Sequence, residues 1–236
     1  MNNSKILYIE KSKNNPTPTL PIKGRGHFAF TLAEVLITLG VIGVVAGMTM
    51  PTLIAHHKKK VVVTRMQKFY SSMNQALKLS ETQNGEYQYW NEINLGRHNP
   101  DTMYDWYKRY LADYFKSKDI EKTADGILVA NTDGSAFGFY NAGSVHVLFC
   151  PEYKGCQNFL KTNDNKIVGA LDGKNTFLFY IDGGNLKTYG ISTNITREQA
   201  KESGGIHACS QSYKGYCSAL IQMDGWQIAD DYPVKF

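Results

Sequence analysis

The chain of 236 residues lacks the sequence signatures of the common catalytic and nucleotide-binding sites. It has no phosphate-binding loop, no G-x-S-x-G, no H-E-x-x-H and no glycine-rich dinucleotide fingerprint. Proline is scarce, with 7 residues, and hydrophobic residues make up 42% of the chain, a composition that excludes a disordered or collagen-like protein. We therefore expect a folded protein that is not an enzyme and that holds no cofactor and no resident metal ion.

Charge is unevenly distributed along the chain. Residues 28–50 contain a single charged side chain, that of Glu34, and residues 56–80 contain six basic side chains and no acidic one. The first 29 residues have a net charge of +4, whereas residues 81–236, with fifteen basic and nineteen acidic side chains, have a net charge of −4. The formal net charge of +5 is thus the sum of regions whose charges differ in sign. The acidic C-terminal part argues against a nucleic-acid partner, because phosphate binding needs clustered Lys and Arg.

Residues 28–50 form an apolar run of 23 residues. A helix needs roughly 20 apolar residues to cross the hydrocarbon core of a bilayer, so the run can span a membrane. The mean hydropathy of −0.35 excludes a protein with many spans. A secretory signal peptide fits poorly, because the run is long and no small-x-small cleavage site follows it. An uncleaved signal anchor, held with its N-terminus in the cytoplasm by the preceding basic residues, is an alternative.

An acidic residue lies within this apolar run. An acid inside a membrane span costs at least ~2.5–3.5 kcal/mol and marks a functional position by default. Glu34 lies four residues after Phe30, and Pro51 follows at the end of the run. The string from Ala29 to Gly40, AFTLAEVLITLG, resembles the prepilin-type cleavage and methylation motif of type IV pilins, type II secretion pseudopilins and competence pilins.

The resemblance implies a processing site. In that family a membrane peptidase removes a short basic leader on the cytoplasmic side, and the new N-terminal residue, usually Phe, is N-methylated. The fifth residue of the processed chain is Glu and the twenty-second is Pro. Cleavage between Ala29 and Phe30 places Glu34 fifth and Pro51 twenty-second. The chain departs from the family in having Ala29 where Gly is usual and a long leader, and a cut after Gly26 would put Glu34 out of register.

The resemblance also implies a function, which is assembly. We expect a pilin-like subunit of a type II secretion pseudopilus or a type IV pilus, with Glu34 and Pro51 as assembly residues. Its partners would be other pilin-like subunits, which it contacts through its helix, the prepilin peptidase and an inner-membrane assembly platform. Its C-terminal domain would lie in the periplasm or outside the cell. The alternatives are a minor pilin at a filament tip that binds glycan, DNA or secreted cargo, and a signal-anchored periplasmic enzyme.

The sequence divides into three parts. They are a cytoplasmic leader over residues 1–29, an N-terminal helix over residues 30–82, whose residues 30–51 span the membrane, and an exported globular domain over residues 83–236. The second half of the helix carries apolar residues at spacings of three and four, namely Val62, Met66, Phe69, Met73 and Leu77. This stripe predicts that the helix packs along one side against the globular domain.

The remaining pattern predicts an α+β fold. A second helix is expected over residues 102–116, where Thr102 and Asp105 resemble a capping box. Short apolar segments separated by Asp-Gly and similar turns predict strands over residues 126–130, 135–140, 145–149, 167–171, 176–181, 186–191 and 219–223. Such hairpins build an antiparallel sheet. The resemblance implies the pilin-like arrangement, in which a long N-terminal transmembrane helix packs on that sheet.

All four cysteines lie in the last 87 residues of the chain. An even number of cysteines in a domain expected outside the cytoplasm predicts disulfides. Three pairings are possible, and proximity in the sequence favours Cys150–Cys156 and Cys209–Cys217.

Two kinds of metal site are alternatives in this region. His146 and His207 lie near two of the cysteines and could complete a zinc site, but the spacings C-x5-C and C-x7-C depart from the usual ligand pattern. The loops at residues 163–165 and 182–185 carry oxygen ligands for calcium, but neither has the spacing of a calcium loop. Hairpin turns are the favoured interpretation of both loops.

Overall fold

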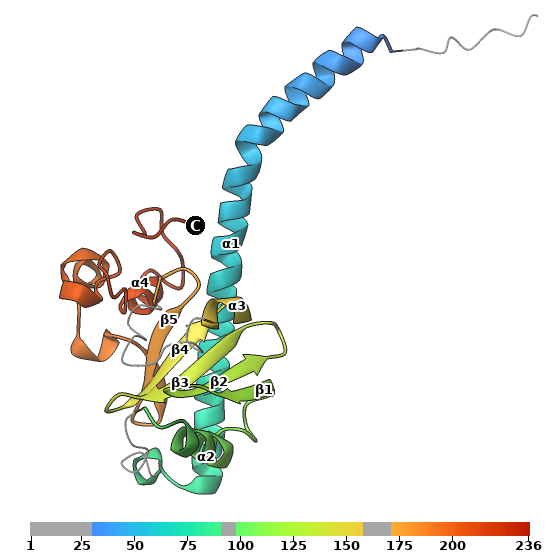
Figure 1. The fold of residues 1–236 in the computed structure, drawn as a ribbon. Helices are drawn as coiled ribbons and strands as arrows, with labels where there is room; N and C mark the ends of the chain where they lie inside the picture. The colour runs from blue at the N-terminus through green and yellow to red at the C-terminus, as the bar shows by residue number, and fades with distance from the viewer. Residues whose placement is uncertain (1–29, 91–97, 158–170) are drawn as a thin grey trace, which may run out of the picture. The chain divides into compact units, whose positions relative to one another are not determined.

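The computed structural model describes residues 30–90, 98–157 and 171–236 (Figure 1). The chain divides into two compact units, Met1–Gly47 and Met48–Phe236, and each is described by itself. The described part of the first unit is residues 30–47. It consists almost entirely of the beginning of helix α1 (Leu32–Asn84), which continues into the second unit.

Helix α1 passes through Pro51 and ends at Asn84, so the expected long helix is confirmed. Pro51 has no backbone N–H, and the carbonyl of Gly47, four residues earlier, therefore loses its α-helical hydrogen bond. The boundary between the two units falls directly after Gly47. Pro51 thus weakens the helix locally without ending it.

The second unit contains one sheet of six strands, each antiparallel to the next and arranged in the order of the sequence. The strands are β1 (Ser117–Lys122), β2 (Gly126–Asn131), β3 (Ala136–Asn141), β4 (Val145–Cys150), β5 (Phe177–Asp182) and β6 (Asn185–Thr188). Gly183 and Gly184, with φ of 55° and 69°, form the tight turn between β5 and β6. The expected antiparallel sheet and the α+β class are confirmed.

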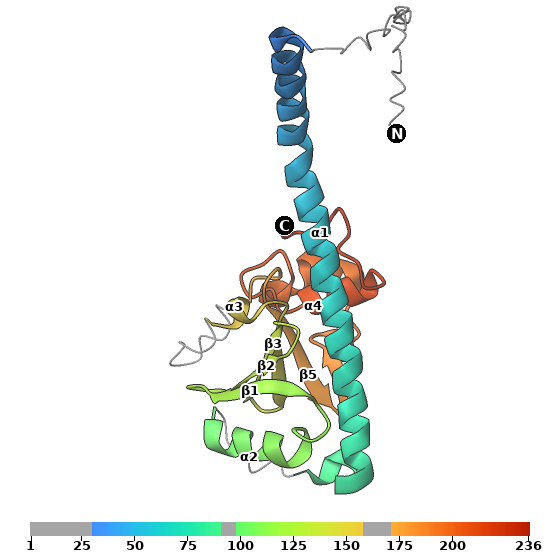
Figure 2. The ribbon, with the colours of Figure 1, turned by 90° about the vertical axis from the view of Figure 1, so that its right-hand side faces the viewer.

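The larger core lies on the sheet face along which α1 runs (Figure 2). Phe69 of α1 is central to it: its ring centroid lies 4.6 Å from that of Phe149 and 5.1 Å from that of Phe137. Helix α2 (Pro100–Tyr110) packs Trp106 and Tyr107 on the same face. The stripe predicted on α1 is buried along its whole length, namely at Val62, Met66, Phe69, Met73 and Leu77.

The opposite face of the sheet carries a smaller core, because successive residues of a strand point to opposite sides. Leu128, Leu148 and Leu178 lie there, together with the disulfide-bonded Cys150 and Cys156. The remaining helical elements are short: η1 (Tyr87–Tyr89), α3 (Tyr153–Cys156), η4 (Ile191–Thr193), η5 (Gln199–Ser203), η6 (Gly205–His207) and α4 (Cys217–Met223).

Helix α2 begins and ends earlier than the predicted range 102–116. Asn99, and not Thr102, is its cap: the Asn99 side-chain oxygen accepts the N–H groups of Asp101 at 3.1 Å and Thr102 at 3.2 Å. Asn is among the best N-cap residues, and Pro100 fits the first helical position, where no donor is needed. The following strand β1 was not predicted, because its sequence SKDIEK is almost entirely polar.

The strand predicted over residues 219–223 is wrong, since these residues belong to helix α4. The pair Asp224-Gly225 ends that helix instead of turning a hairpin. The N–H of Gly225 donates to the carbonyl of Gln222 at 3.1 Å, and the N–H of Trp226 donates to that of Ile221 at 2.9 Å. These are the two bonds of a Schellman motif, and Gly225 has the positive φ, 71°, that the motif requires.

One further strand prediction extends beyond the observed strand, and another lies almost entirely outside the described residues. The strand predicted over residues 186–191 ends at Thr188, where β6 ends. The strand predicted over residues 167–171 lies, except for Leu171, outside the described residues.

We expect Phe69→Ala to destabilise the second unit by about 3–5 kcal/mol, because it leaves a cavity in the core. Phe69 is only 3% exposed. Urea unfolding of the detergent-solubilised chain, followed by near-UV circular dichroism, would measure the loss. The control is Gln67→Ala on the exposed side of the same helix, which should change the stability by less than about 0.5 kcal/mol. Equal losses in the two variants would contradict the central role of Phe69.

Candidate functional site

A reciprocal pair of side chains closes the first turn of α1. The backbone N–H and the hydroxyl of Thr31 donate to Oε2 of Glu34 at 2.8 Å and 2.9 Å, and the backbone N–H of Glu34 donates to Oγ1 of Thr31 at 3.2 Å. Because α1 begins at Leu32, Thr31 is the N-cap and Glu34 the third helical residue, which together make a capping box. The helix start is therefore fixed next to the expected cleavage position.

Sequence reasoning missed this role of Glu34, although its signal was present. The pattern T-x-x-E directly before an apolar run is a typical helix start. A carboxylate in the first turn also interacts favourably with the helix dipole. Glu34 thus has a local structural role in addition to the assembly role that the resemblance implies.

The expected processing site is described only from Phe30 onward. Ala29 and the rest of the leader, residues 1–29, lie outside the described residues. Phe30 is 82% exposed and directly precedes the capping box. Phe30 and Glu34 belong to the first unit, whereas Pro51 belongs to the second.

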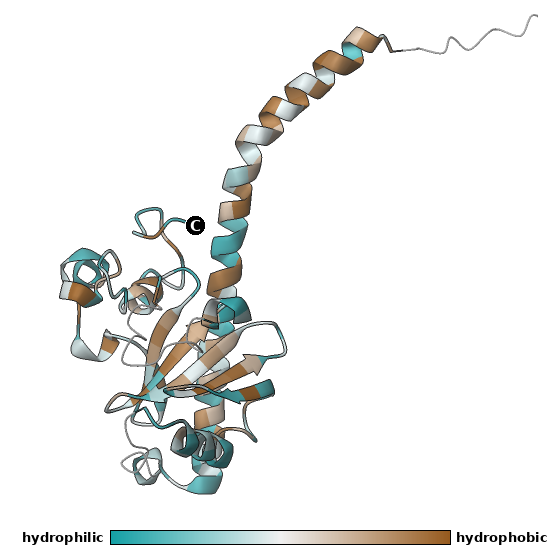
Figure 3. Cartoon of the chain, in the orientation of Figure 1, coloured by the Kyte–Doolittle hydropathy of each residue, from teal (hydrophilic) through white to brown (hydrophobic). Residues whose placement is uncertain are grey.

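The first half of α1 is apolar on all sides. Its large side chains are exposed, Leu32 at 78% and Met48 at 74% for example. In Figure 3 the start of the helix is mostly brown, and a teal stretch follows further along it. By length and composition this helix can cross a membrane, and it is a candidate span near the N-terminus.

The four cysteines form two disulfides, Cys150–Cys156 and Cys209–Cys217, which confirms the favoured pairing. The bonds remove the thiolates that a zinc site would need. Within residues 30–90, 98–157 and 171–236, no group of three or more His, Cys, Asp or Glu side chains could hold a metal ion. Of the two calcium candidates, residues 182–185 form the turn between β5 and β6, and residues 163–165 lie outside the described residues.

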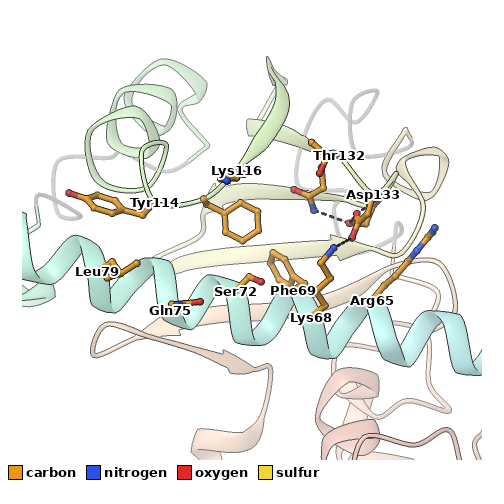
Figure 4. Close-up of a pocket in the computed structure, with 13 residues that line it drawn as sticks. Arg65, Lys68, Phe69, Ser72, Gln75, Leu79, Tyr114, Lys116, Thr132 and Asp133 are labelled. Atoms are coloured by element: carbon orange, nitrogen blue, oxygen red, sulfur yellow. Dashed lines mark hydrogen bonds and ion pairs between the residues drawn. The ribbon is translucent and has the colours of Figure 1, made fainter.

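A groove of about 450 Å³ runs between α1 and the turn from β2 to β3 (Figure 4). Lys68 of α1 crosses it, and its Nζ lies 2.8 Å from Oδ2 of Asp133. Asp133 also accepts the hydroxyl and the backbone N–H of Ser135. Burial opposes ionisation of Asp133, but the bonds from Lys68 and Ser135 outweigh it and lower its pKa to about 2. The groove is therefore a charged junction between helix and sheet.

Aromatic and histidine rings gather around the smaller core. The ring of His146 lies 5.2 Å from that of Tyr140 and 5.7 Å from that of Tyr189, and Tyr189 lies 5.6 Å from His207. Burial lowers the pKa of both histidines, which favours their neutral forms. The sequence offered these two histidines as ligands only in the alternative of a zinc site, and the structure places them among tyrosines.

The described part of the chain thus defines an α+β protein with a candidate membrane-spanning helix and a disulfide-bonded globular unit. A family model described as a family of unknown function (DUF6613) matches residues 52–236, and the chain belongs to that family. The match begins directly after Pro51 and covers almost all of the second unit. No curated protein and no solved structure matches the chain.

We expect Asp133→Asn to lower the stability of the second unit at neutral pH and to have little effect near pH 2. The folded pKa of about 2 lies below the ordinary value of 3.8, so the ionised carboxylate stabilises the fold above that value. This contribution is lost as the pH falls through the folded pKa. Urea midpoints of the two chains at pH 7 and about pH 2 would measure it. Asp113→Asn, at an exposed position, is the control, and a loss that is independent of pH would contradict the ionic role.

Proposed function

We propose that the protein is a pilin-like structural subunit of a type II secretion pseudopilus or a type IV pilus. It enters the inner membrane with its N-terminus in the cytoplasm, is cut after Ala29 and is methylated on Phe30. It then joins a filament through the first half of α1. The observation that carries the proposal is the register of Phe30, Glu34 and Pro51 in the apolar run, as first, fifth and twenty-second residues of the processed chain.

The start of α1 supports this register. The helix begins at Leu32, so a cut after Ala29 would leave Phe30 as the N-terminal residue, followed directly by the capping box that Thr31 begins. A free amine at Phe30 would be a positive charge close to the carboxylate of Glu34 of the same or a neighbouring subunit. An unpaired charge in a medium of low dielectric constant is expensive, so this pairing favours one register between subunits.

The surface of the first half of α1 also supports assembly. Gly40, Gly43 and Gly47 repeat at helical spacing and form a strip of small residues, along which another helix can approach closely. The buried stripe of the second half anchors the globular unit to the same helix. One helix therefore serves both as filament contact and as support for the exported domain.

Mass spectrometry of the N-terminus of the membrane-extracted protein tests the processing step. We expect a chain that begins at Phe30 and carries one added methyl group, since the motif places the cut after Ala29. Ala29→Gly, which restores the usual residue of the family, should be cut at the same bond and at least as fast. An intact Met1, or a cut elsewhere, would contradict the proposal.

Variants at Glu34 separate its charge from its cap. Glu34→Ala should insert into the membrane but lose incorporation into filaments. Glu34→Gln keeps a residue that can complete the capping box, so it should keep the helix start and still lose incorporation. Thr31→Ala is the matched control: it removes the cap, which weakens the first turn by about 1 kcal/mol, and keeps the charge. Crosslinking between subunits would measure incorporation, and normal incorporation of Glu34→Gln would show that the charge does not set the register.

A further inference from the structure

A cluster of basic residues lies on α1 shortly after the apolar run of residues 28–50. It consists of His56, His57, Lys58, Lys59 and Lys60, which we call the basic collar. Four of its side chains are exposed and that of Lys59 is partly exposed. From Val35 to Ser80 the chain has no acidic residue that could compensate it locally.

The collar has no carboxylate partner among the residues that the structure describes. Other lysines of the second unit do have one. Lys68 pairs with Asp133, Lys122 with Asp101 at 2.7 Å, and Lys187 with Asp182 at 2.7 Å. The lysines of the collar thus form a group of positive charges without a carboxylate partner among the described residues. Several other lysines of the same unit have such a partner.

Two grooves flank α1 at the collar. One, of about 370 Å³, is lined by His57 and Lys58 and by Lys174 of a distant segment. The other, of about 430 Å³, is lined by His56, Lys59 and Lys60. The ammonium group of Lys174 lies 5.5 Å above the ring of Phe236 and donates to the carbonyl of Lys235 at 3.0 Å. The tertiary fold therefore brings Lys174 to the groove beside His57 and Lys58, together with one acidic residue, Glu152. The lysines of the helix itself supply the excess of positive charge.

The distance from the apolar segment places the collar near a membrane surface. The expected span ends at Pro51, and a helix rises 1.5 Å per residue, so Lys58–Lys60 lie about 10–14 Å further along the axis. The headgroup region of one leaflet is about 5–7 Å thick. Long lysine side chains extend back along the helix toward the membrane surface, so their ammonium groups can reach the phosphates.

The sign of the charge is unusual for that side of the membrane. With the leader in the cytoplasm, the three lysines of the collar, Lys58, Lys59 and Lys60, lie beyond the opposite end of the span. Lys and Arg are normally enriched on the cytoplasmic side and not on this one. A positive cluster in this place therefore calls for a specific counter-charge.

We propose that the basic collar binds the headgroups of anionic phospholipids in the leaflet from which the globular unit emerges. The proposal rests on membrane insertion of the apolar segment, which is part of the proposed function. Bound headgroups would hold the globular unit at the membrane surface while the subunit is not in a filament.

The test uses the full chain in nanodiscs of phosphatidylcholine alone or with about 30% phosphatidylglycerol. Brief acetylation followed by mass spectrometry gives the reaction rate of each lysine. Addition of phosphatidylglycerol should slow Lys58, Lys59 and Lys60 roughly threefold to fivefold each, and about 0.5 M NaCl should reverse this. Three exposed lysines of the same unit are internal controls and should not respond, namely Lys108, Lys116 and Lys118.

A matched pair of variants tests the cause. Lys58→Gln/Lys59→Gln/Lys60→Gln should lose the enrichment of phosphatidylglycerol over phosphatidylcholine that co-purifies with the chain, and Lys108→Gln/Lys116→Gln/Lys118→Gln should keep it. Equal lysine rates in both bilayers, or equal enrichment in both variants, would overturn the proposal. Protection by inorganic phosphate in phosphatidylcholine alone would overturn it as well, because it would identify a soluble anion as the ligand.

These outcomes are separable from those of the proposed function. A chain that keeps its leader or forms no filament, but whose collar responds to phosphatidylglycerol, would retain the lipid site and refute the filament subunit. A chain that is cut after Ala29 and joins filaments, but whose collar does not respond to phosphatidylglycerol, would support the filament subunit and refute the lipid site.

Discussion

The burial of one stripe of α1 against the phenylalanine-rich face of the sheet is the contact on which the second unit depends. The ring of Phe69 contacts four other phenylalanine rings. They are Phe137, Phe149 and Phe179 of β3, β4 and β5, and Phe115 of the segment before β1. A sheet with one apolar face must bury that face against another element. The helix is therefore part of the globular core, and the unit would expose its largest apolar surface without it.

The same helix meets a different environment in its first half. Before Ala55 it is apolar on all sides and exposed, and beyond the collar it is apolar on one side and buried there. A helix that is apolar all round belongs in a membrane or among other helices, whereas a helix with one apolar stripe belongs at the surface of a core. Pro51 and the unit boundary after Gly47 lie near the point where the exposed apolar part of α1 gives way to the part with one buried stripe.

Glu34 shows how a charged group is accommodated in the apolar segment. Its carboxylate accepts two hydrogen bonds from Thr31 within a single turn. Local bonds of this kind lower the cost of placing a polar group away from water. An acid in the apolar run therefore does not by itself require a partner subunit. What points to assembly is the combined register of Phe30, Glu34 and Pro51.

Much of the architecture followed from local signals in the sequence. Three kinds of local signal led to correct predictions: the spacing of the α1 stripe, the Asp-Gly turns at residues 133–134 and 182–183, and the short separations between cysteines. The Asp-Gly pair at residues 224–225 did not, because it ends helix α4. The T-x-x-E start of α1 was equally local and could have been found. The strand predicted over residues 219–223 was wrong, because a short apolar run fits a buried helix as well as a strand.

The rest depended on contacts between residues far apart in the chain. The polar strand β1 exists because β2 supplies its hydrogen bonds, with Ile120 opposite Val129, and no pattern within SKDIEK reveals it. The pairing of Lys68 with Asp133 and the approach of Lys174 to the collar join segments that only the folded sheet brings together. The sequence by itself determined the apolar segment, its acid and the helix register, since these depend on spacing along one helix. Only the tertiary structure decided which charges are compensated, because compensation depends on distance in space.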